Sequence, residues 1–323
     1  MLTTTIDIAL PVLNEERGLQ RSVETVSDWL SQHCPYRWTV SVVDNGSVDR
    51  SWELAVAVAG ALPNVRALRL HQRGRGRALK AAWATSGADV LAYMDIDLST
   101  ELRALGPLLE TVAEGRADVA IGSRLSRQAQ VTRSLQREII SHLYNHIARA
   151  ALGYRVRDAQ CGFKAVSAEV ARCIVPLVVD DSWFFDTELL VLAWRQGLRI
   201  QELPVRWVED DDSRVRILTT AIDDLRGIWR LRRFGRRAPT DSPFDPAALI
   251  VDQVPAGAST PATAAGCDPG PSGPAASSPP PGPGAAHRPT AAAPGSAVDG
   301  GAPPESAGRP VRPGSAVPGG PAR

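Results

Sequence analysis

Two acidic residues one position apart, Asp95 and Asp97, follow the apolar run at residues 90–94. A short run of this composition predicts a buried strand, so both carboxylates are expected at its carboxyl end. Carboxylate oxygens are the ligands that Mg²⁺ and Mn²⁺ prefer, and such a cation can bridge a diphosphate. The pair therefore predicts a metal site for a nucleotide diphosphate; solvated turn chemistry after a strand is the alternative.

A second candidate is a basic, glycine-rich turn after the apolar run at residues 65–70. Arg75 lies between Gly74 and Gly76, and Lys80 follows one helical turn later. Glycines let the backbone approach a phosphate, and a helix amino terminus adds partial positive charge. A solvated basic loop is the alternative.

Asp44 is the third candidate, at the end of the run at residues 38–43. Its carboxylate can accept the imide N–H of uracil or the N–H groups of guanine. It can also form an Asx-turn before the next helix, which Ser47 could cap, and the two roles are compatible. Glu15, after the first apolar run, can contact a base or ribose or complement a helix dipole.

The elements that position these residues alternate between strand and helix. Strand-like runs occupy residues 6–13, 38–43, 65–70, 90–94 and 119–121, each followed by apolar residues at helical spacing. This order predicts an α/β fold with a mostly parallel sheet and helices on both faces. Ligands bind beyond the carboxyl ends of the strands in such sheets, where the candidate residues fall. A dinucleotide-binding dehydrogenase is disfavoured because G-x-G-x-x-G does not follow the first strand.

Composition divides the chain near residue 236. Of its 26 prolines, six precede residue 237 and twenty follow. The later part is otherwise mostly Ala, Gly, Ser and Thr, which provide little apolar surface to offset chain ordering. We expect one folded domain at residues 1–236 and a disordered, low-complexity tail at residues 237–323.

Charge and cysteine usage narrow the class of protein. The net charge is +1, so nothing global indicates nucleic acid. The four cysteines lack metal-ligand spacing and suit a reducing compartment. No signal peptide and no apolar run of the roughly 18 residues needed to span a bilayer is evident. We expect a cytoplasmic protein, with peripheral contact to the cytoplasmic face of a membrane as an option.

Six short motifs in order carry a resemblance to a known family. They are Pro11-Val12-Leu13-Asn14-Glu15, Val43-Asp44-Asn45-Gly46-Ser47-Val48-Asp49, Arg73-Gly74-Arg75-Gly76, Asp95-Ile96-Asp97, Gly122-Ser123-Arg124 and Asp158-Ala159-Gln160-Cys161-Gly162-Phe163-Lys164. Across residues 5–232 this set resembles glycosyltransferase family 2, and within it the dolichyl-phosphate or polyprenyl-phosphate glucosyl- and mannosyltransferases. The resemblance implies a GT-A fold and transfer of a sugar from a nucleotide diphosphate with inversion.

The resemblance also implies roles for individual residues. Donor-binding residues would be Pro11, Asn14, Glu15, Asp44, Arg75, Lys80 and Asp95. Catalytic residues would be Asp97, Arg124 and Asp186, with Asp95 and Asp97 holding the metal. The acceptor phosphate or its loop would involve Arg124, Gln160 and Lys164, whereas Cys161 packs rather than reacts. Asp158 and Gln160 would orient the loop or the sugar. Ser99 stands where several mannosyltransferases have a metal-binding Gln, which disfavours a mannosyl-like site.

The expected activity is inverting transfer of a hexose, with UDP-glucose favoured, to a polyprenyl or dolichyl phosphate. That acceptor oxygen is already anionic, so Asp186 would position the sugar, whereas a hydroxyl acceptor would require it as a general base. GDP-mannose as donor, a hydroxyl acceptor, and a noncatalytic sugar-nucleotide-binding or scaffold protein are the alternatives.

Two amphipathic segments bear on the membrane. Leu218, Ile222, Leu225 and Trp229 share one helical face, and Arg226, Arg230, Arg233 and Arg237 share another. Such a helix can lie in an anionic bilayer interface or can pack on a core. For the segment with Ile139, Leu143 and Ile147 we expect ordinary packing; the resemblance offers contact with the lipid carrier as the alternative, since this region makes that contact in related enzymes.

Overall fold

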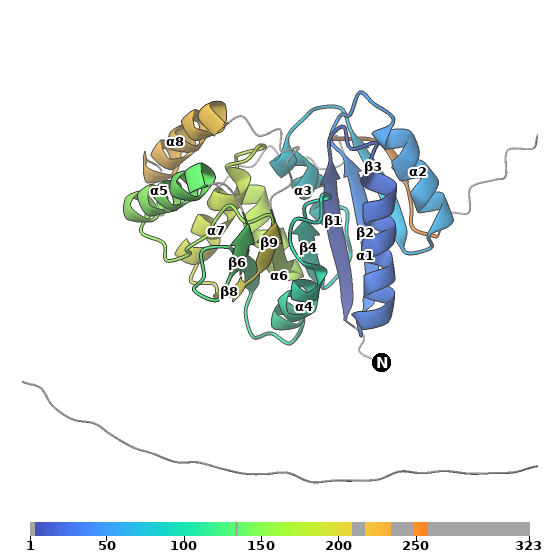
Figure 1. The fold of residues 1–323 in the computed structure, drawn as a ribbon, viewed down its shortest axis with the longest axis horizontal. Helices are drawn as coiled ribbons and strands as arrows, with labels where there is room; N and C mark the ends of the chain where they lie inside the picture. The colour runs from blue at the N-terminus through green and yellow to red at the C-terminus, as the bar shows by residue number, and fades with distance from the viewer. Residues whose placement is uncertain (1–3, 133–134, 209–216, 234–248, 258–323) are drawn as a thin grey trace, which may run out of the picture. The chain divides into compact units, whose positions relative to one another are not determined.

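The computed structural model describes residues 4–132, 135–208, 217–233 and 249–257. They form an α/β unit with one large mixed sheet and a small second sheet (Figure 1). The predicted fold class, a mostly parallel sheet with helices on both faces, is confirmed. All five predicted strands are present, displaced at their ends by at most two residues.

The large sheet has eight strands within the described ranges. Their spatial order is β10 (Ile250–Val254), β3 (Val65–Leu70), β2 (Arg37–Asp44), β1 (Thr5–Val12), β4 (Val90–Met94), β7 (Phe163–Ser167), β5 (Val119–Ser123) and β8 (Ile200–Pro204). The parallel pair β6 (Gln130–Thr132) and β9 (Arg206–Val208) makes the second sheet. Chain order reverses between β1 and β4, and such a switch point is where α/β sheets bind ligands.

Helices cover both faces of the sheet. They are α1 (Leu19–His33), α2 (Ser51–Ala61), α3 (Arg75–Ala84), α4 (Leu105–Ala113), α5 (Leu135–Leu152), α6 (Ala168–Ile174), α7 (Phe185–Arg195) and α8 (Ile217–Arg233), with 3₁₀ turns at Leu102–Ala104 and Val175–Leu177. One apolar core joins α1, α2 and α4 to the sheet, and a second joins α3 and α5–α8. Residues of β1 alternate between the two cores, with Ile8 and Leu10 in one and Ala9 in the other.

The antiparallel strand β7 matters most for function. It inserts between β4 and β5, with Tyr93 opposite Lys164. The residues just before β7 are thereby brought to the carboxyl end of β4, where Asp95 and Asp97 follow.

Part of the segment expected to be a disordered tail belongs to the fold. Strand β10 pairs antiparallel with β3, which corrects the expected boundary at residue 236. Its Ile250 and Val254 are partly buried, and pairing covers the β3 edge that would otherwise be open. The rest of the expected tail, apart from residues 249–257, lies outside the described residues.

The start of α2 also differs from prediction. Ser47 does not cap this helix, which begins at Ser51 without a side-chain cap. The Ser47 hydroxyl instead accepts the backbone N–H of Asn14 at 2.9 Å. The serine therefore joins the ends of β1 and β2.

Candidate active site

The two predicted metal ligands lie at the carboxyl end of β4. Asp95 retains 42% exposure of its side chain, and Asp97 is exposed. Asp97 Oδ1 accepts the N–H of Ser99 at 2.9 Å, and Leu98 between them has φ +56°, so the loop turns sharply. Burial raises the pKa of Asp95, Arg75 opposes the rise, and the Asp97 and Asp186 charges add to it.

Arg75 lies at the centre of the site. Its guanidinium donates to Asp95 Oδ1 at 2.5 Å and to Asp186 Oδ2 at 3.2 Å. It lies 5.2 Å from the ring centre of Tyr93 and 5.0 Å from that of Trp183. Burial would lower the pKa of Arg75, but Asp95, Tyr93 and Asp186 raise it overall, so the cation is permanent.

Asp186, at the start of α7, has both carboxylate oxygens occupied. Oδ1 accepts Lys164 Nζ at 2.6 Å and the Tyr93 hydroxyl, while Oδ2 accepts Arg75. The residue is only 2% exposed. Two cations, Lys164 and Arg75, therefore lie against the Asp186 carboxylate.

Lys164 differs from its expected role at the acceptor phosphate. Its side chain is completely buried, and Nζ donates to Asp186, the Tyr93 hydroxyl and the Cys161 carbonyl. An ammonium has three donors, and all three are used inside the protein. Lys164 therefore neutralises Asp186 from behind the site.

Arg124 and Asp158 form a bidentate ion pair beneath the loop before β7. Arg124 Nε and Nη2 each lie 2.9 Å from an Asp158 oxygen, and the guanidinium lies 5.6 Å from the Trp207 ring centre. Burial opposes ionisation of both groups, yet their mutual attraction raises the pKa of Arg124 and lowers that of Asp158. Arg124 is 15% exposed.

Cys161 is a packing residue in this structure. It is 1% exposed, and burial raises the pKa of its thiol to about 12. A neutral thiol is a poor nucleophile.

The carboxyl ends of β1 and β2 hold Asp44 and the Asn14 loop. Asp44 is fully buried; Oδ1 accepts the Ser47 N–H at 3.2 Å, and Arg69 Nε lies 3.3 Å from Oδ2. Oδ2 is ion-paired with Arg69 but makes no hydrogen bond among the described residues, so the Asx-turn leaves this oxygen able to accept one. This arrangement fits a ligand N–H.

The other predicted donor residues of this loop hold its shape. Asn14 has φ +58°, and its Oδ1 accepts the Val48 N–H at 2.9 Å. Glu15 donates its backbone N–H to Ser51 Oγ at 2.8 Å, and Pro11 lies opposite Val43 in the β1–β2 ladder.

The glycine-rich turn does not present its helix terminus as an open phosphate site. The N–H groups of Gly76 and Arg77 donate to the carbonyls of Ser182 and Asp181. Lys80 Nζ lies 2.9 Å from Asp181 Oδ1, which corrects its expected place at the donor. Burial opposes ionisation of Asp181, but Lys80 and Arg77 lower its pKa.

A divalent cation fits the Asp95 and Asp97 pair. The described residues contain no group of three or more His, Cys, Asp or Glu side chains arranged for a metal. Two carboxylates suit Mg²⁺ or Mn²⁺ because such ions in phosphate-transfer sites complete their coordination with phosphate oxygens and water. The Ser99 hydroxyl, buried and unpartnered beside Asp97, is a further oxygen at this position.

Sequence comparison places this site in a family. The profile of glycosyl transferase family 2 matches residues 7–175, just over half of the chain and all the strands around Asp95. The chain belongs to glycosyltransferase family 2.

Several relatives of this transferase are similar over much of its length. Glycosyltransferase AglD of Haloferax volcanii is 36% identical over 70% of this chain and 37% of its own length, so the chain spans little more than a third of that relative. A dolichyl-phosphate beta-glucosyltransferase, ALG5D, of Trichomonas vaginalis is 27% identical over 70% of this chain and 76% of its own. The dolichyl-phosphate beta-glucosyltransferase of Saccharomyces cerevisiae is 24% identical over 68% of this chain and 71% of its own length.

Solved structures agree on the fold. Glucosyl-3-phosphoglycerate synthase from Mycobacterium tuberculosis, in complex with UDP, has a TM-score of 0.56 at 20% identity, covering 71% of this chain and 80% of that one. The same enzyme with Mn²⁺, UDP and glucosyl-3-phosphoglycerate has a TM-score of 0.53 at 19% identity, over 72% and 80%. The GT-A fold of the transferase is thereby confirmed.

Three residues of the transferase site were missed in the sequence. Tyr93 precedes Asp95 by two positions, so strand alternation could have placed it on the same face. Gly162 allows close contact, because a Cβ there would overlap Asp95 Oδ2 and Arg75. Asp224 interrupts the buried face of α8, where Ile228 and Leu231 follow at helical spacing.

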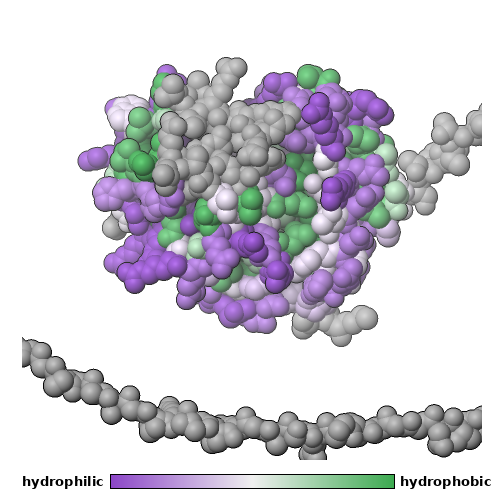
Figure 2. All heavy atoms as spheres, viewed as in Figure 1, coloured by the Kyte–Doolittle hydropathy of each residue, from purple (hydrophilic) through white to green (hydrophobic). Residues whose placement is uncertain are grey.

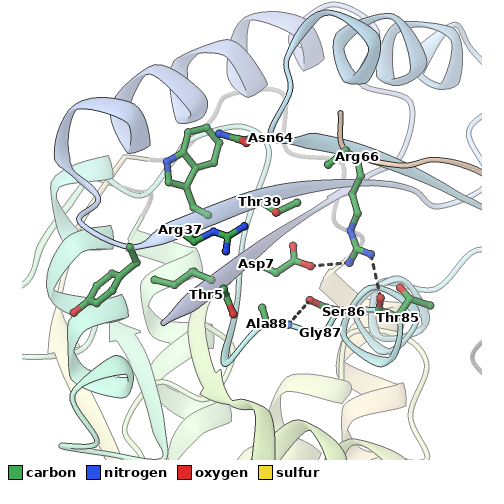
Figure 3. A pocket seen from close by; sticks show the side chains of 14 residues that line it. Thr5, Asp7, Arg37, Thr39, Asn64, Arg66, Thr85, Ser86, Gly87 and Ala88 are labelled. Carbon is green, nitrogen blue, oxygen red and sulfur yellow. Dashed lines mark hydrogen bonds and ion pairs between the residues drawn. The ribbon is translucent and has the colours of Figure 1, made fainter. Parts of the chain in front are cut away.

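A second polar hollow of the transferase lies at the amino end of the parallel strands (Figure 3). Arg66 crosses it, with Nη2 2.7 Å from Asp7 Oδ2 and Nε 2.6 Å from Ser41 Oγ. Its remaining donors meet the carbonyls of Ala82 and Thr85. Asp7 and Arg66 match each other's charge in this hollow, whereas at the other end Arg75 is shared between Asp95 and Asp186.

Proposed function

We propose that this protein transfers glucose from UDP-glucose to a polyprenyl phosphate such as dolichyl phosphate, with inversion and with Mg²⁺ or Mn²⁺. The observation that carries the proposal is the buried and hydrogen-bonded state of Asp186. Both of its oxygens already accept hydrogen bonds, Oδ1 from Lys164 and Tyr93 and Oδ2 from Arg75, and the residue is 2% exposed, so it is poorly placed to deprotonate a hydroxyl. A phosphate acceptor needs no such base because its oxygen is anionic near neutral pH.

The donor assignment is supported by relatives and by residue chemistry. Similar proteins are named dolichyl-phosphate beta-glucosyltransferases, and solved structures of the same fold hold UDP, UDP-glucose and Mn²⁺. Asp44 Oδ2, which makes no hydrogen bond among the described residues, suits the imide N–H of uracil. A cation held by Asp95 and Asp97 would neutralise the diphosphate as it leaves.

The transfer itself is a single displacement. An acceptor phosphate oxygen forms a bond to the anomeric carbon while the bond from that carbon to the donor diphosphate breaks. The electron pair leaves with UDP, and no proton transfer is needed. Arg75 holds positive charge beside Asp95, and Lys164 keeps Asp186 in place.

A membrane-facing surface would bring the lipid acceptor to this site. Helices α5 and α8 lie side by side and display what we call the α5–α8 apolar face (Figure 1). Its members and their exposed fractions are Ile139 66%, Leu143 57%, Ile147 39%, Ile222 51%, Leu225 53% and Trp229 64%. Hydrophobic surface is visible over these helices in Figure 2. Sequence reasoning was wrong for α5, whose three residues do not pack in the core.

Charge supports a bilayer as the partner of this face. Arg226 is exposed, and the Arg233 guanidinium lies 5.5 Å from the Trp229 ring centre. Apolar residues flanked by arginines suit an anionic membrane interface. Leu218 and Arg237 fall outside the residues whose side chains are described. No helix in the described ranges has the length and apolar character to cross a bilayer.

The activity is tested by offering radiolabelled UDP-glucose or GDP-mannose with a short polyprenyl phosphate, in Mn²⁺ or EDTA. We expect glucose in the organic phase only with metal. Asp97→Asn should lower the rate at least about a hundredfold, while Glu101→Gln, a nearby surface carboxylate paired with Arg103, should not. Mannose in the lipid product would change the donor, and a water-soluble product would overturn the lipid acceptor.

The membrane face is tested by sedimentation with vesicles of phosphatidylcholine and phosphatidylserine. The Leu225→Ser and Trp229→Ser double variant should lose binding, and Val48→Ser, which removes an 81%-exposed apolar residue elsewhere, should retain it. Equal binding by all three proteins would contradict the role of this face.

A further inference from the structure

The loop before β7 is tied to α8 by a buried polar pair. Gln160 Nε2 donates to Asp224 Oδ2 at 2.8 Å. Asp224 is 4% exposed, and its second oxygen, Oδ1, has no partner among the described residues. Holding a carboxylate in this position is unfavourable, since a buried acceptor without a donor carries a desolvation cost. Packing alone does not explain the residue.

The environment of Asp224 is acidic rather than basic. Burial raises its pKa to about 7; Gln160 opposes the rise, and Asp180, Asp223 and Asp186 add to it. On the α8 side, Arg226 pairs with Asp223 and Arg230 pairs with Glu188. From α5, the Tyr144 hydroxyl is bonded to Thr187. Among the described groups, Gln160 is thus the hydrogen-bond partner of Asp224.

This pair fixes which end of the Gln160 amide is available. Above its raised pKa Asp224 is an ionised carboxylate that only accepts hydrogen bonds, so the amide nitrogen faces Asp224 and the amide oxygen turns away. A carbonyl oxygen suits a hydroxyl group and does not suit a phosphate, which is itself an acceptor.

The position of Gln160 relates it to the donor side of the site. It lies two residues before Gly162, where any added Cβ would meet Asp95 Oδ2 and Arg75. It also lies two residues after Asp158, which holds Arg124. Gln160 therefore belongs to a short loop, residues 158–162, whose two ends contact Arg124 and the Asp95–Arg75 pair.

We propose that Asp224 is a positioning residue that orients Gln160, whose amide oxygen accepts a hydrogen bond from a hydroxyl of the donor hexose. This inference rests on the proposed function and adds a specificity determinant to it. It makes Gln160 a contact to the sugar instead of the acceptor phosphate. Residue Asp224 acts on selectivity only through Gln160.

The test compares binding of UDP-glucose with binding of UDP, each by calorimetry with Mn²⁺. Asp224→Asn and Gln160→Met should weaken UDP-glucose binding about tenfold, the loss expected for one hydrogen bond to a sugar hydroxyl. UDP binding should not change in either variant. Asp223→Asn is the matched control, because Asp223 is the adjacent exposed carboxylate and faces Arg226.

Monodeoxy analogues of UDP-glucose identify the hydroxyl. One analogue should bind wild-type protein about tenfold more weakly than UDP-glucose, and the same deletion should have no further effect in Gln160→Met. Parallel loss of UDP and UDP-glucose binding in the variants would show a merely structural role and overturn the proposal, as would unchanged binding of both.

The outcome is separable from that of the proposed function. If wild-type protein binds UDP-glucose and the variants behave as expected but no lipid product forms, the acceptor is wrong and the Gln160 contact stands. If Asp224→Asn abolishes transfer to an alcohol while UDP-glucose binding is intact, Asp224 is a general base and the positioning role fails.

Discussion

Each end of the parallel strands carries an Asp–Arg ion pair, and the two ends differ in what remains unmatched. At the amino end, Arg66 satisfies Asp7 and its own donors meet Ser41 and two carbonyls. At the carboxyl end, Arg75 is shared between Asp95 and Asp186. The carboxyl end also holds buried oxygens on Asp44 and Ser99 that make no hydrogen bond with any described residue.

Backbone conformation follows the same division. The described non-glycine residues with positive φ are Asn14 and Leu98, and both lie in loops at the carboxyl end. Such conformations cost free energy and persist where surrounding contacts hold them. Charge density, unmatched acceptors and backbone strain together distinguish a binding site from a hollow that is only polar.

Removing the buried cation at the carboxyl end should have the largest effect. Lys164→Met leaves Asp186 without one of its two cations, so we expect a loss of about 3–5 kcal/mol in the free energy of unfolding, with loss of transfer. Urea denaturation followed by circular dichroism measures the first. The double variant Lys164→Met, Asp186→Asn should regain part of the stability but no activity; full recovery of activity would contradict the assigned role of Asp186.

Gly162→Ala tests the geometry of the carboxyl end without changing any of its charges. The added Cβ would overlap Asp95 and Arg75, so the loop must shift. A displacement of about 1 Å in a reacting arrangement can lower the rate about a hundredfold. The matched change is Gly87→Ala, which meets no atom within 4 Å. Similar transfer rates for the two variants would show that the close contact is unimportant.

Asp7→Asn tests the amino end. The substitution removes the charge opposite Arg66 and should lower the free energy of unfolding by about 1–3 kcal/mol. Transfer rate per folded molecule should be unchanged because this pair lies at the other end of the strands. A fall in rate without a change in stability would mean that the two ends are coupled.

The same comparison shows what the sequence could predict. Strand Val90–Met94 was predictable because its apolar run is continuous and local. Asp95 and Asp97 were predictable because they directly follow such a run. Lys164 was misplaced because its environment depends on antiparallel pairing of β7 with β4, which no local pattern records.

Long-range contacts also explain the remaining differences. Lys80 is a residue type that often binds phosphate, but in the structure its ammonium is paired with Asp181, which lies 101 positions later in the chain. Strand β10 was not predicted because it lies in a proline-rich part of the sequence. Its pairing with β3 is a long-range contact that the local sequence does not record. The exposure of Ile139 and Leu143 could not be deduced either, since an apolar helical face looks alike whether it meets a core or a membrane.

Asp224→Asn should have the smallest effect on stability, and it should raise the free energy of unfolding where Lys164→Met and Asp7→Asn lower it. The pKa of Asp224 is raised to about 7 in the folded state, above its ordinary value of 3.8. Between these values the folded state holds a proton that the unfolded state has lost, so stability falls as pH rises through this range. The penalty is complete above pH 7 and absent below about pH 4.

Because asparagine is neutral at every pH, Asp224→Asn should melt a few degrees higher than the wild-type protein at pH 8, and the difference should disappear at pH 4. Thermal unfolding at the two pH values measures this, with Asp223→Asn expected to show a smaller difference because Asp223 is only one of the charges that raise the pKa of Asp224. A lower melting temperature for Asp224→Asn at pH 8 would show that the carboxylate stabilises the fold. The expected gain in stability with loss of sugar binding is typical of a residue kept for function.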